Sequence, residues 1–255
     1  MKPTGNTILI TGGGSGIGEA LAHRFHDRGD TVVVAGRRQD ALDAACAGRA
    51  RMHALTLDVD TPAGIADFVQ RLLAAHPAVN VLVNNAGIMR IESIDTSRAL
   101  DDAEETVTTN LLGPIRLIDA LVDHLKGQPD AAIVNVTSGL AFVPLVDAAV
   151  YCATKAGMHS YTVSLRDALA GQVEVIELAP PGVQTGLTPG QATRPGYMPL
   201  DDYADQVVAQ FGQVPTPSEI LVDRSRHLRD AEAEGRFDQT FRQLNDGARA
   251  ARAAQ

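Results

Sequence analysis

The chain lacks most of the features on which metal and disulfide chemistry depend. It has no tryptophan and only two cysteines, Cys46 and Cys152, which are too few and too far apart for a disulfide framework or a thiolate metal site. His23 and His26 have a suggestive spacing, but no cysteine or carboxylate cluster accompanies them. We therefore expect no bound metal and assign these two histidines to a solvated helix face.

Long apolar segments are also missing. No run approaches the roughly 20 residues that a membrane-spanning helix needs, and the short apolar stretch near the N-terminus leads directly into glycines. An excess of basic charge is absent as well, because 22 Lys and Arg residues face 31 Asp and Glu residues, for a formal net charge of -9. Since nucleic acids attract basic surfaces, we expect neither a nucleic acid nor a membrane as partner and predict a cytoplasmic protein.

What the sequence does contain is an alternation of short apolar runs and longer segments with helical periodicity. The runs predict strands at 7–10, 31–35, 52–59, 79–83, 131–136 and 173–178. The periodic segments predict helices at 16–28, 61–76, 100–126 and 150–169. Continuously apolar strands separated by helices predict an α/β fold with a doubly wound parallel sheet, the Rossmann fold. With no linker and no internal repeat, we expect residues 1–255 to form a single domain.

The character of the chain changes after the sixth predicted strand. Residues 180–199 are rich in proline and glycine, and we assign 180–216 to a loop region that crosses the ligand-binding edge of the sheet. Residues 220–245 have helical character, so we expect a helical C-terminal extension in place of a seventh strand. Residues 246–255 have almost no apolar content and are expected to fray.

A glycine-rich turn follows the first predicted strand and opens the first predicted helix. Glycines at 12, 16 and 18 let the backbone turn tightly and approach a pyrophosphate, and the helix N-terminus offers free N–H groups to it. Folds that bind S-adenosylmethionine share such a turn. A nucleoside-triphosphate loop is excluded because Glu19, and not lysine, follows Gly18.

The end of the second predicted strand carries Arg37 and Arg38. In a dinucleotide-binding fold this position meets the adenosine ribose, where arginine suits a 2′-phosphate and an acidic residue suits a free hydroxyl. The arginines favour NADP(H) over NAD(H), although the nearby Asp40 leaves NAD(H) open. Asp58, after the third strand, could accept a hydrogen bond from the adenine amino group or cap a turn.

Ser138, Tyr151 and Lys155 form a second group far along the chain. Tyr151 and Lys155 are four residues apart, so a helix places them on one face. Lowering the pKa of a tyrosine from about 10 to about 7 requires about 4 kcal/mol, and a cation about 4 Å away supplies roughly that at an effective dielectric near 20. The pair can therefore exchange protons near neutral pH without a metal.

These motifs, taken in order, resemble the short-chain dehydrogenase/reductase family. The motifs are Thr11-Gly12-x-x-x-Gly16-Ile17-Gly18, Asn84-Asn85-Ala86-Gly87, Asn110, Ser138 and Tyr151-x-x-x-Lys155. Two further segments, 137–142 and 229–238, resemble the branch of the family associated with D-alanyl-lipoteichoic acid biosynthesis. The resemblance extends from about residue 7 to residue 185.

The resemblance implies a catalytic tetrad. Tyr151 would be the general acid–base, Lys155 would lower its pKa and bind the nicotinamide ribose, Ser138 would orient the substrate oxygen, and Asn110 would hold a water linked to Lys155. Pro181 stands where the family usually has glycine, so the backbone contacts to the nicotinamide could differ there. The cofactor-binding residues expected from the resemblance are Gly12, Gly14, Ser15, Gly16, Ile17, Gly18, Arg37, Arg38, Asp58, Val59, Asn85, Ala86, Gly87, Tyr151, Lys155, Pro181, Gly182, Val183 and Thr185.

The function that this resemblance implies is hydride transfer between NADP(H) and a carbonyl or secondary alcohol. Pocket walls are expected from 88–89, 140–145 and 187–198, which are mostly apolar, so the substrate would be an apolar ketone or aldehyde. The alternatives are a catalytically silent dinucleotide-binding regulatory protein and a methyltransferase, while a serine hydrolase is disfavoured because Ser138 lacks the first glycine of a nucleophile elbow. We expect a homodimer formed through the helices that carry Asn110 and Tyr151.

Overall fold

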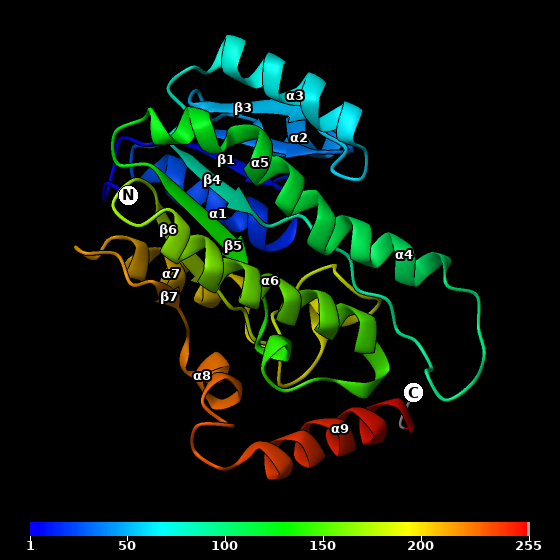
Figure 1. The fold of residues 1–255 in the computed structure, drawn as a ribbon. Coiled ribbons are helices and arrows are strands. Elements are labelled where there is room, and N and C mark those ends of the chain that lie inside the picture. Colours follow the sequence, from blue (N-terminus) through cyan, green and yellow to red (C-terminus); the bar gives the residue numbers. More distant parts are fainter. Residues whose placement is uncertain (254–255) are drawn as a thin grey trace.

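The computed structural model describes residues 1–253. Within these residues the chain forms one seven-stranded parallel sheet in the order β3-β2-β1-β4-β5-β6-β7 (Figure 1). The strands are β1 (Thr7–Thr11), β2 (Thr31–Gly36), β3 (Met52–Thr56), β4 (Val81–Asn84), β5 (Ala132–Val136), β6 (Glu174–Leu178) and β7 (Glu219–Ile220). The sequence prediction of a doubly wound α/β fold is confirmed.

Helices cover both faces of the sheet. They are α1 (Gly16–Asp27), α2 (Gln39–Cys46), α3 (Pro62–Ala75), α4 (Asp101–Val107), α5 (Gly113–Lys126), α6 (Ala149–Ala168), α7 (Leu200–Phe211), α8 (Asp223–Arg229) and α9 (Phe237–Ala253). Successive strand residues point to opposite faces: Ile8 and Ile10 join the core under α1 and α7, and Leu9 joins the core under α3 and α5. None of the described helices is both long and apolar enough to cross a membrane.

Local sequence signals account for several helix boundaries. The Thr61 side chain accepts a hydrogen bond from the Gly64 N–H at 3.1 Å, and Pro62 occupies the first turn of α3. Both are residues that favour a helix N-terminus. Gly29, with a φ of 105°, follows the end of α1, where the left-handed backbone favours glycine.

The long helix expected at 100–126 contains an irregular turn. The chain is helical from α4 through α5, but five residues between them, Thr108–Leu112, form a π-helical turn. Asn110 lies in this turn and is 1% exposed. Such π-bulges often occur at functional sites, and here the turn directs the Asn110 side chain toward the loop that follows β4.

The expectation of a helix in place of a seventh strand is wrong. Glu219 and Ile220 form β7, which pairs in parallel with Glu177 and Leu178 of β6. Ile220 is fully buried. A ladder of two residues is too short to leave a periodic signal in the sequence, and its pairing depends on burial against β6. The helical extension begins only at α8.

Two further helices, α2 and α7, were not expected from the sequence. The segment 180–216 contains an irregular part followed by α7, which packs on α1 through the edge-to-face rings of Phe25 and Phe211. Figure 1 shows α8 and α9 leaving the sheet and lying along the loops that precede α6. The tail expected to fray, 246–255, is helical through Ala253, and its last two residues lie outside the described part.

Candidate active site

The loops after β1 and β4 are joined at the carboxyl edge of the sheet. These two strands are neighbours, and the strand order reverses between them, which is where such sheets bind ligands. The Thr11 hydroxyl oxygen accepts from the backbone N–H groups of Asn85 and Ala86, both at 3.0 Å. The Asn85 side chain donates to the Thr11 carbonyl at 2.9 Å. These bonds hold the two loops as one rigid surface.

The glycine turn leaves no room for side chains at two positions. A Cβ at Gly18 would lie 2.4 Å from the Gly12 carbonyl oxygen and 2.5 Å from the Asn85 side-chain nitrogen. Gly12 has a φ of 67°, and a Cβ there would lie 3.0 Å from the Cα of Ala86. The turn is therefore compact because these positions are glycines, and the α1 N-terminus stays open to a phosphate group.

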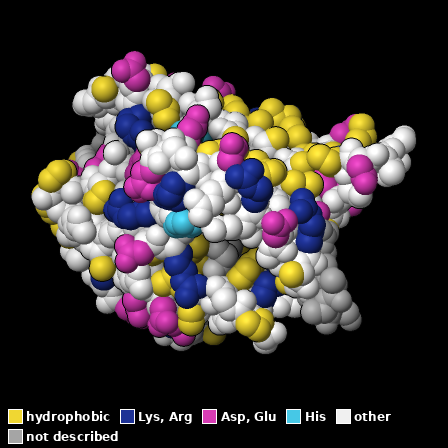
Figure 2. Space-filling view, turned by 90° about the horizontal axis from the view of Figure 1, so that it is seen from below, with side chains coloured by type: hydrophobic (Ala, Val, Ile, Leu, Met, Phe, Trp, Pro, Cys, Tyr) yellow, Lys and Arg dark blue, Asp and Glu magenta, His cyan; other side chains and the backbone are white. Residues whose placement is uncertain are grey.

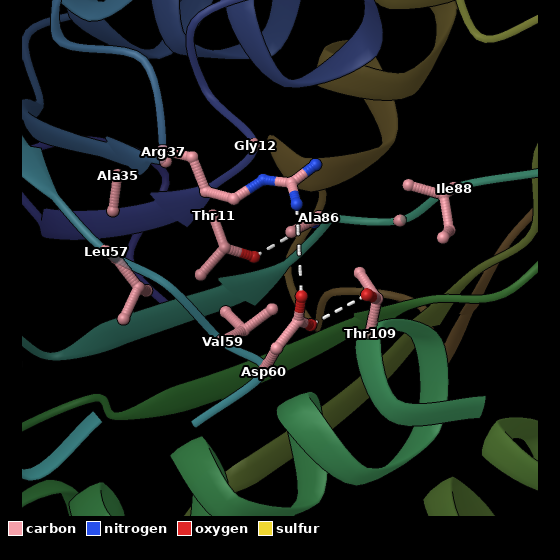
Figure 3. Close-up of a pocket in the computed structure, with 12 residues that line it drawn as sticks. Thr11, Gly12, Ala35, Arg37, Leu57, Val59, Asp60, Ala86, Ile88 and Thr109 are labelled. Carbon is pink, nitrogen blue, oxygen red and sulfur yellow. Dashed lines mark hydrogen bonds and ion pairs between the residues drawn. The ribbon is translucent and has the colours of Figure 1, made fainter. Parts of the chain in front are cut away.

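A cleft of about 140 Å³ opens beside this turn (Figure 3). Its lining residues are Thr11, Gly12, Ala35, Gly36, Arg37, Leu57, Val59, Asp60, Ala86, Gly87, Ile88 and Thr109. Figure 3 shows the Arg37 side chain extending across the cleft toward the Asp60 carboxylate, at 3.9 Å. Asp60 also accepts a hydrogen bond from the Thr109 hydroxyl at 2.7 Å. The lining therefore combines aliphatic side chains with the charged and polar side chains of Arg37, Asp60 and Thr109.

Not all residues expected to hold a cofactor line this cleft. Arg37 and Val59 do, whereas Arg38 is exposed at the start of α2. Asp58 is exposed, and its carboxylate accepts from the Asp60 N–H at 3.1 Å, which corresponds to the turn-capping alternative. Five expected residues, Gly14, Ser15, Gly16, Ile17 and Gly18, belong to the glycine turn and the first turn of α1.

Two lining residues, Asp60 and Thr109, were missed by the sequence analysis. Asp60 lies just after β3, two residues beyond Asp58, and Thr109 precedes Asn110. Their 2.7 Å hydrogen bond joins positions 49 residues apart in the chain. Their adjacency to expected site residues was the only available signal.

Three chemically active side chains converge at the end of β5. Tyr151 and Lys155 project from α6, and Ser138 follows β5; they are 8%, 5% and 7% exposed. Ser138 hydrogen-bonds the Tyr151 phenol, an interaction that favours the phenolate. The Lys155 Nζ lies 5.7 Å from the centroid of the Tyr151 ring. The structure therefore brings together the tyrosine, lysine and serine that the sequence singled out.

The pKa of Tyr151 differs from the sequence expectation. Burial raises this pKa to about 12, although the hydrogen bond from Ser138 acts in the opposite direction. Burial also lowers the pKa of Lys155 to about 8. Desolvation opposes the charged form of both groups and is the largest cause of both shifts.

Asn110 and Lys155 meet beside the loop that follows β4. The Asn110 carboxamide accepts from the Ile88 N–H at 2.9 Å and donates to the Ile88 carbonyl at 2.8 Å. Lys155 Nζ donates to the Val136 carbonyl at 2.8 Å. A Cβ at Gly87 would lie 3.2 Å from the Asn110 Oδ1 and 3.7 Å from Lys155 Nζ. The Asn110 side chain therefore positions this loop within reach of the lysine.

The segment after β6 folds back over the glycine turn. Val183 forms a parallel bridge with Met198, and the Tyr197 ring lies against Gly182, where a Cβ would be 3.0 Å from it. The Thr185 Cβ would lie 3.5 Å from a Cβ at Gly16. Thr185 therefore lies beside the glycine turn, and Pro181, which has no N–H, lies just before Gly182.

A buried glutamine organises this segment and was not expected from the sequence. Gln191 is 6% exposed, and its amide donates to the Val183 carbonyl at 2.8 Å and to the Thr185 hydroxyl oxygen at 3.1 Å. It also accepts from the Thr188 hydroxyl at 2.8 Å. These three bonds fix the residues that face the glycine turn.

Apolar side chains pack against the cluster that contains Tyr151. Met89, Leu140 and Leu145 pack against the cluster formed by Ala148, Tyr151 and Cys152. Of the other expected wall residues, Phe142 packs edge-to-face on His159, with ring centroids 4.9 Å apart, and Met198 belongs to the main core. The expected apolar wall is thus present in part, around the tyrosine.

A second cavity, of about 230 Å³, has Tyr151 among its lining residues. It is lined by Arg90, Ile91, Glu92, Arg98, Ala99, Asp102, Ala103, Thr106, Val150 and Tyr151. The Glu92 carboxylate accepts from the Val150 N–H at 2.7 Å and from Arg98 at 2.6 Å. This carboxylate caps the N-terminal turn of α6 and fixes the loop beside the tyrosine. Within the described residues no cluster of His, Cys, Asp and Glu side chains is placed to hold a metal ion.

Comparison with known proteins identifies similar chains over the whole length. A family model described as short chain dehydrogenase matches residues 6–195. The "Uncharacterized oxidoreductase DltE" of Bacillus subtilis (strain 168) is 39% identical over 252 residues, which cover 96% of this chain and 98% of that protein. Both findings agree with the resemblance seen in the sequence motifs.

Solved structures with the same fold include complexes with either form of the nicotinamide cofactor. A short chain dehydrogenase from Burkholderia cenocepacia J2315 in complex with NADP has a TM-score of 0.80 at 23% identity, covering 96% of this chain and 99% of that chain. A 3-ketoacyl-(acyl-carrier-protein) reductase from Brucella melitensis complexed with NADH has a TM-score of 0.77 at 27% identity, covering 88% of this chain and 100% of that chain.

Proposed function

The chain belongs to the short-chain dehydrogenase/reductase family, and from this premise we propose that it is an NADP(H)-dependent reductase of apolar ketones or aldehydes. The observation that carries the proposal is the convergence of Ser138, Tyr151 and Lys155 beside the glycine turn. A silent binding protein would have no use for a buried phenol, ammonium and hydroxyl in contact.

The glycine turn and its cleft fit a dinucleotide. The space that Cβ atoms at Gly12 and Gly18 would fill is taken by close backbone packing, so a pyrophosphate can lie against the N-terminus of α1. We assign the adenine to the part of the cleft lined by Val59 and Asp60, and the nicotinamide to the side of Gly87, where Lys155 Nζ would lie 3.7 Å from an added Cβ. NADPH, when bound, supplies a hydride to the carbonyl carbon of the substrate.

Proton transfer is the work of the protein's own residues. Ser138 donates a hydrogen bond to the substrate carbonyl oxygen and holds it next to the Tyr151 phenol. Tyr151 gives its proton to that oxygen as the carbon is reduced, which yields the alcohol and a phenolate. Lys155 stabilises the phenolate by its charge until solvent restores the proton. Burial raises the pKa of Tyr151 to about 12, which makes the phenol a weaker acid, so the charge of Lys155 is needed to favour the phenolate that the transfer leaves.

Preference for NADP(H) is supported by Arg37. Its side chain is 59% exposed, and its nearest carboxylates, on Asp60 and Glu105, lie at 3.9 and 4.0 Å. Ion pairs this long are weak, so the guanidinium is available to a 2′-phosphate, which it can bind with two parallel hydrogen bonds. Among the described residues no carboxylate lies within hydrogen-bond distance of it.

The apolar substrate is supported by the walls around the tyrosine. Met89, Leu140 and Leu145 offer aliphatic surface next to Tyr151, and burying apolar substrate atoms there contributes about 25 cal/mol per Å². A ketone or aldehyde with aliphatic substituents matches this surface. Turnover confined to charged substrates would contradict this part of the proposal.

A homodimer in the cytoplasm completes the proposal. Leu112 and Val163 are 39% and 47% exposed, and they lie on the helical segments that carry Asn110 and Tyr151. Exposed aliphatic side chains of this kind on paired helices are typical of an isologous interface.

The decisive experiment has two stages. Fluorescence titration with NADPH and NADH measures which cofactor binds, and a panel of aliphatic ketones and aldehydes, with charged carbonyl compounds as comparison, measures turnover with that cofactor. We expect tighter binding of NADPH and reduction of the aliphatic compounds. Binding of S-adenosylmethionine without either nicotinamide cofactor, or binding of NADPH without turnover of any carbonyl compound, would overturn the proposal.

A further inference from the structure

A single asparagine of the C-terminal helix is tied to the loop in front of α6. Asn245 lies on α9, yet it is only 2% exposed. Its Oδ1 accepts from the Val146 N–H at 2.8 Å, and its Nδ2 donates to the Pro144 carbonyl at 3.1 Å and to the Phe241 carbonyl at 2.9 Å. The side chain therefore holds the backbone on either side of Leu145.

Leu145 is also held from the opposite direction. The Cys152 Sγ accepts from the Leu145 N–H at 3.3 Å, and the thiol donates to the Leu145 carbonyl at 3.6 Å. The Leu145 side chain packs on the cluster of Ala148, Tyr151 and Cys152. Thus α6 and α9 together fix one apolar side chain against the catalytic tyrosine.

The beginning of the same loop is held by α8. A Cβ at Gly139 would lie 2.8 Å from the Leu228 Cδ1, so the helix packs directly on the residue after Ser138. Arg229 lies 4.9 Å above the Phe142 ring and forms a two-pronged ion pair with Glu219 of β7, at 2.9 and 3.0 Å. Both ends of the segment 139–146 therefore depend on the C-terminal extension.

The outer face of α9 is an ordinary solvated surface. Figure 2, which views the molecule from the side on which α9 lies in Figure 1, shows basic and acidic side chains interspersed rather than gathered by sign. The inner face carries the half-buried Phe237 and Phe241 with stacked rings 6.1 Å apart, together with Asn245. The specific contacts of the helix are therefore directed inward, at the loop.

We propose that Asn245 is a positioning residue that fixes Leu145 as a wall of the substrate pocket, so that α9 sets how large a carbonyl substrate can reach Tyr151. The inference deepens the proposed reductase activity and rests on it. An amide is needed because Val146 requires an acceptor and Pro144 requires a donor. Asn245→Asp keeps the acceptor for the Val146 N–H but loses the donor for the Pro144 carbonyl. Asn245→Leu, with a side chain of similar size, loses both.

The test compares Asn245→Asp and Asn245→Leu with Gln243→Leu, a control at an exposed position of the same helix. Hydrogen exchange of the peptide covering 140–148 is measured against the peptide covering 6–20, which contains the glycine turn. Losing one buried hydrogen bond corresponds to about a tenfold change. Asn245→Leu loses both hydrogen bonds to the loop, so we expect at least tenfold faster exchange in 140–148, and no change in 6–20 or in the control.

Steady-state kinetics with ketones of increasing size provide the functional readout. For the variants of Asn245 we expect KM for the best wild-type substrate to rise about tenfold, kcat to stay nearly unchanged, and bulkier ketones to gain relative to small ones. A loss that is uniform across all ketones, or that appears mainly in kcat, would overturn the inference. Asn245→Asp keeps the test decisive if Asn245→Leu does not fold.

The two proposals fail in different ways. If the wild-type protein reduces no ketone or aldehyde, the proposed function fails, whatever the exchange data show. If the wild type is active and the Asn245 variants keep both its exchange pattern and its substrate profile, the inference about α9 fails while the reductase activity stands. NADPH titration of every variant confirms that the cofactor site remains folded.

Discussion

The Nζ of Lys155 lies 5.7 Å from the centroid of the Tyr151 ring, one helical turn further along α6. Neither side chain is more than 8% exposed. Burial raises the pKa of the phenol to about 12 and lowers that of the ammonium to about 8. Burial thus disfavours the charged form of each group alone, and a phenolate formed at Tyr151 and the Lys155 cation would stabilise each other.

Replacing the proposed acid tests the mechanism directly. Tyr151→Phe removes the phenolic proton but keeps the ring and its packing. We expect kcat to fall by about 10²- to 10⁴-fold, the usual contribution of a general acid, while NADPH binds as in the wild type. Steady-state kinetics and fluorescence titration check the two parts. Unchanged turnover would refute the role of Tyr151.

Tyr203→Phe is the matched control. Tyr203 is fully buried in α7, and its hydroxyl has no hydrogen-bond partner among the described residues. Because a buried hydroxyl without a partner costs free energy, we expect this variant to unfold at a higher temperature, with a gain of about 1 kcal/mol. Its kcat should equal that of the wild type. Calorimetry showing a clear loss of stability would mean that the hydroxyl is satisfied in solution.

The lowered pKa of Lys155 predicts a pH dependence of stability. Between pH 8 and the ordinary value of 10.5 the unfolded chain binds more protons at this lysine than the folded protein does, so stability rises with pH in that window. Relative to Lys155→Met, the wild type should gain about 2 kcal/mol between pH 7 and pH 9.5. Denaturant unfolding of both proteins at the two pH values measures the difference. The same difference in stability between the two proteins at both pH values would contradict the lowered pKa of Lys155.

Gly18→Ala tests the compactness of the phosphate turn. The added Cβ would lie 2.4 Å from the Gly12 carbonyl oxygen, so the turn has to open. We expect a loss of stability of about 1–3 kcal/mol and a marked loss of NADPH affinity. Gly186→Ala is the control, because a Cβ at this exposed glycine meets no atom within 4 Å. Equal affinities for NADPH in the two variants would argue against the assignment of the turn.

Arg37→Ala tests the choice of cofactor. If the guanidinium binds the 2′-phosphate, its removal costs about 1.5–3 kcal/mol of NADPH affinity, at least tenfold in Kd. NADH affinity should stay unchanged or improve. Arg38→Ala is expected to have a smaller effect, since Arg38 does not line the cleft. Equal losses for NADPH and NADH would show that Arg37 does not read the phosphate.

The homodimer is tested at α6. Val163→Arg places a charge at a position that is 47% exposed and expected to be covered by the partner. Light scattering should find a dimer for the wild type and a monomer for the variant, because a buried unpaired charge opposes association. Val214→Arg, at an apolar position 80% exposed outside α6, should remain a dimer. A tetramer for the wild type would contradict the proposal.

The sequence predicted the architecture because its signals are local. Apolar runs and helical spacing identified six of the seven strands and the helical segments of α1, α3, α4, α5 and α6, and the four-residue spacing of Tyr151 and Lys155 placed both on one face of α6. β7 was missed because two residues carry no periodicity. Helices α2 and α7 were missed because stronger signals stand next to them in the sequence. The arginine pair precedes α2, and the proline-rich loop precedes α7.

The sequence by itself determined the parallel sheet, the glycine turn and the order of the site motifs, since each depends on the conformation or spacing of residues that are close in the chain. Tertiary structure alone decided that Asp60 and Thr109 share the cofactor cleft and that Asn245 holds a loop about 100 residues earlier, at separations of 99 and 101 positions. It also decided that burial raises the pKa of Tyr151. Long-range hydrogen bonds and desolvation depend on which segments the fold packs together, and no local pattern records that.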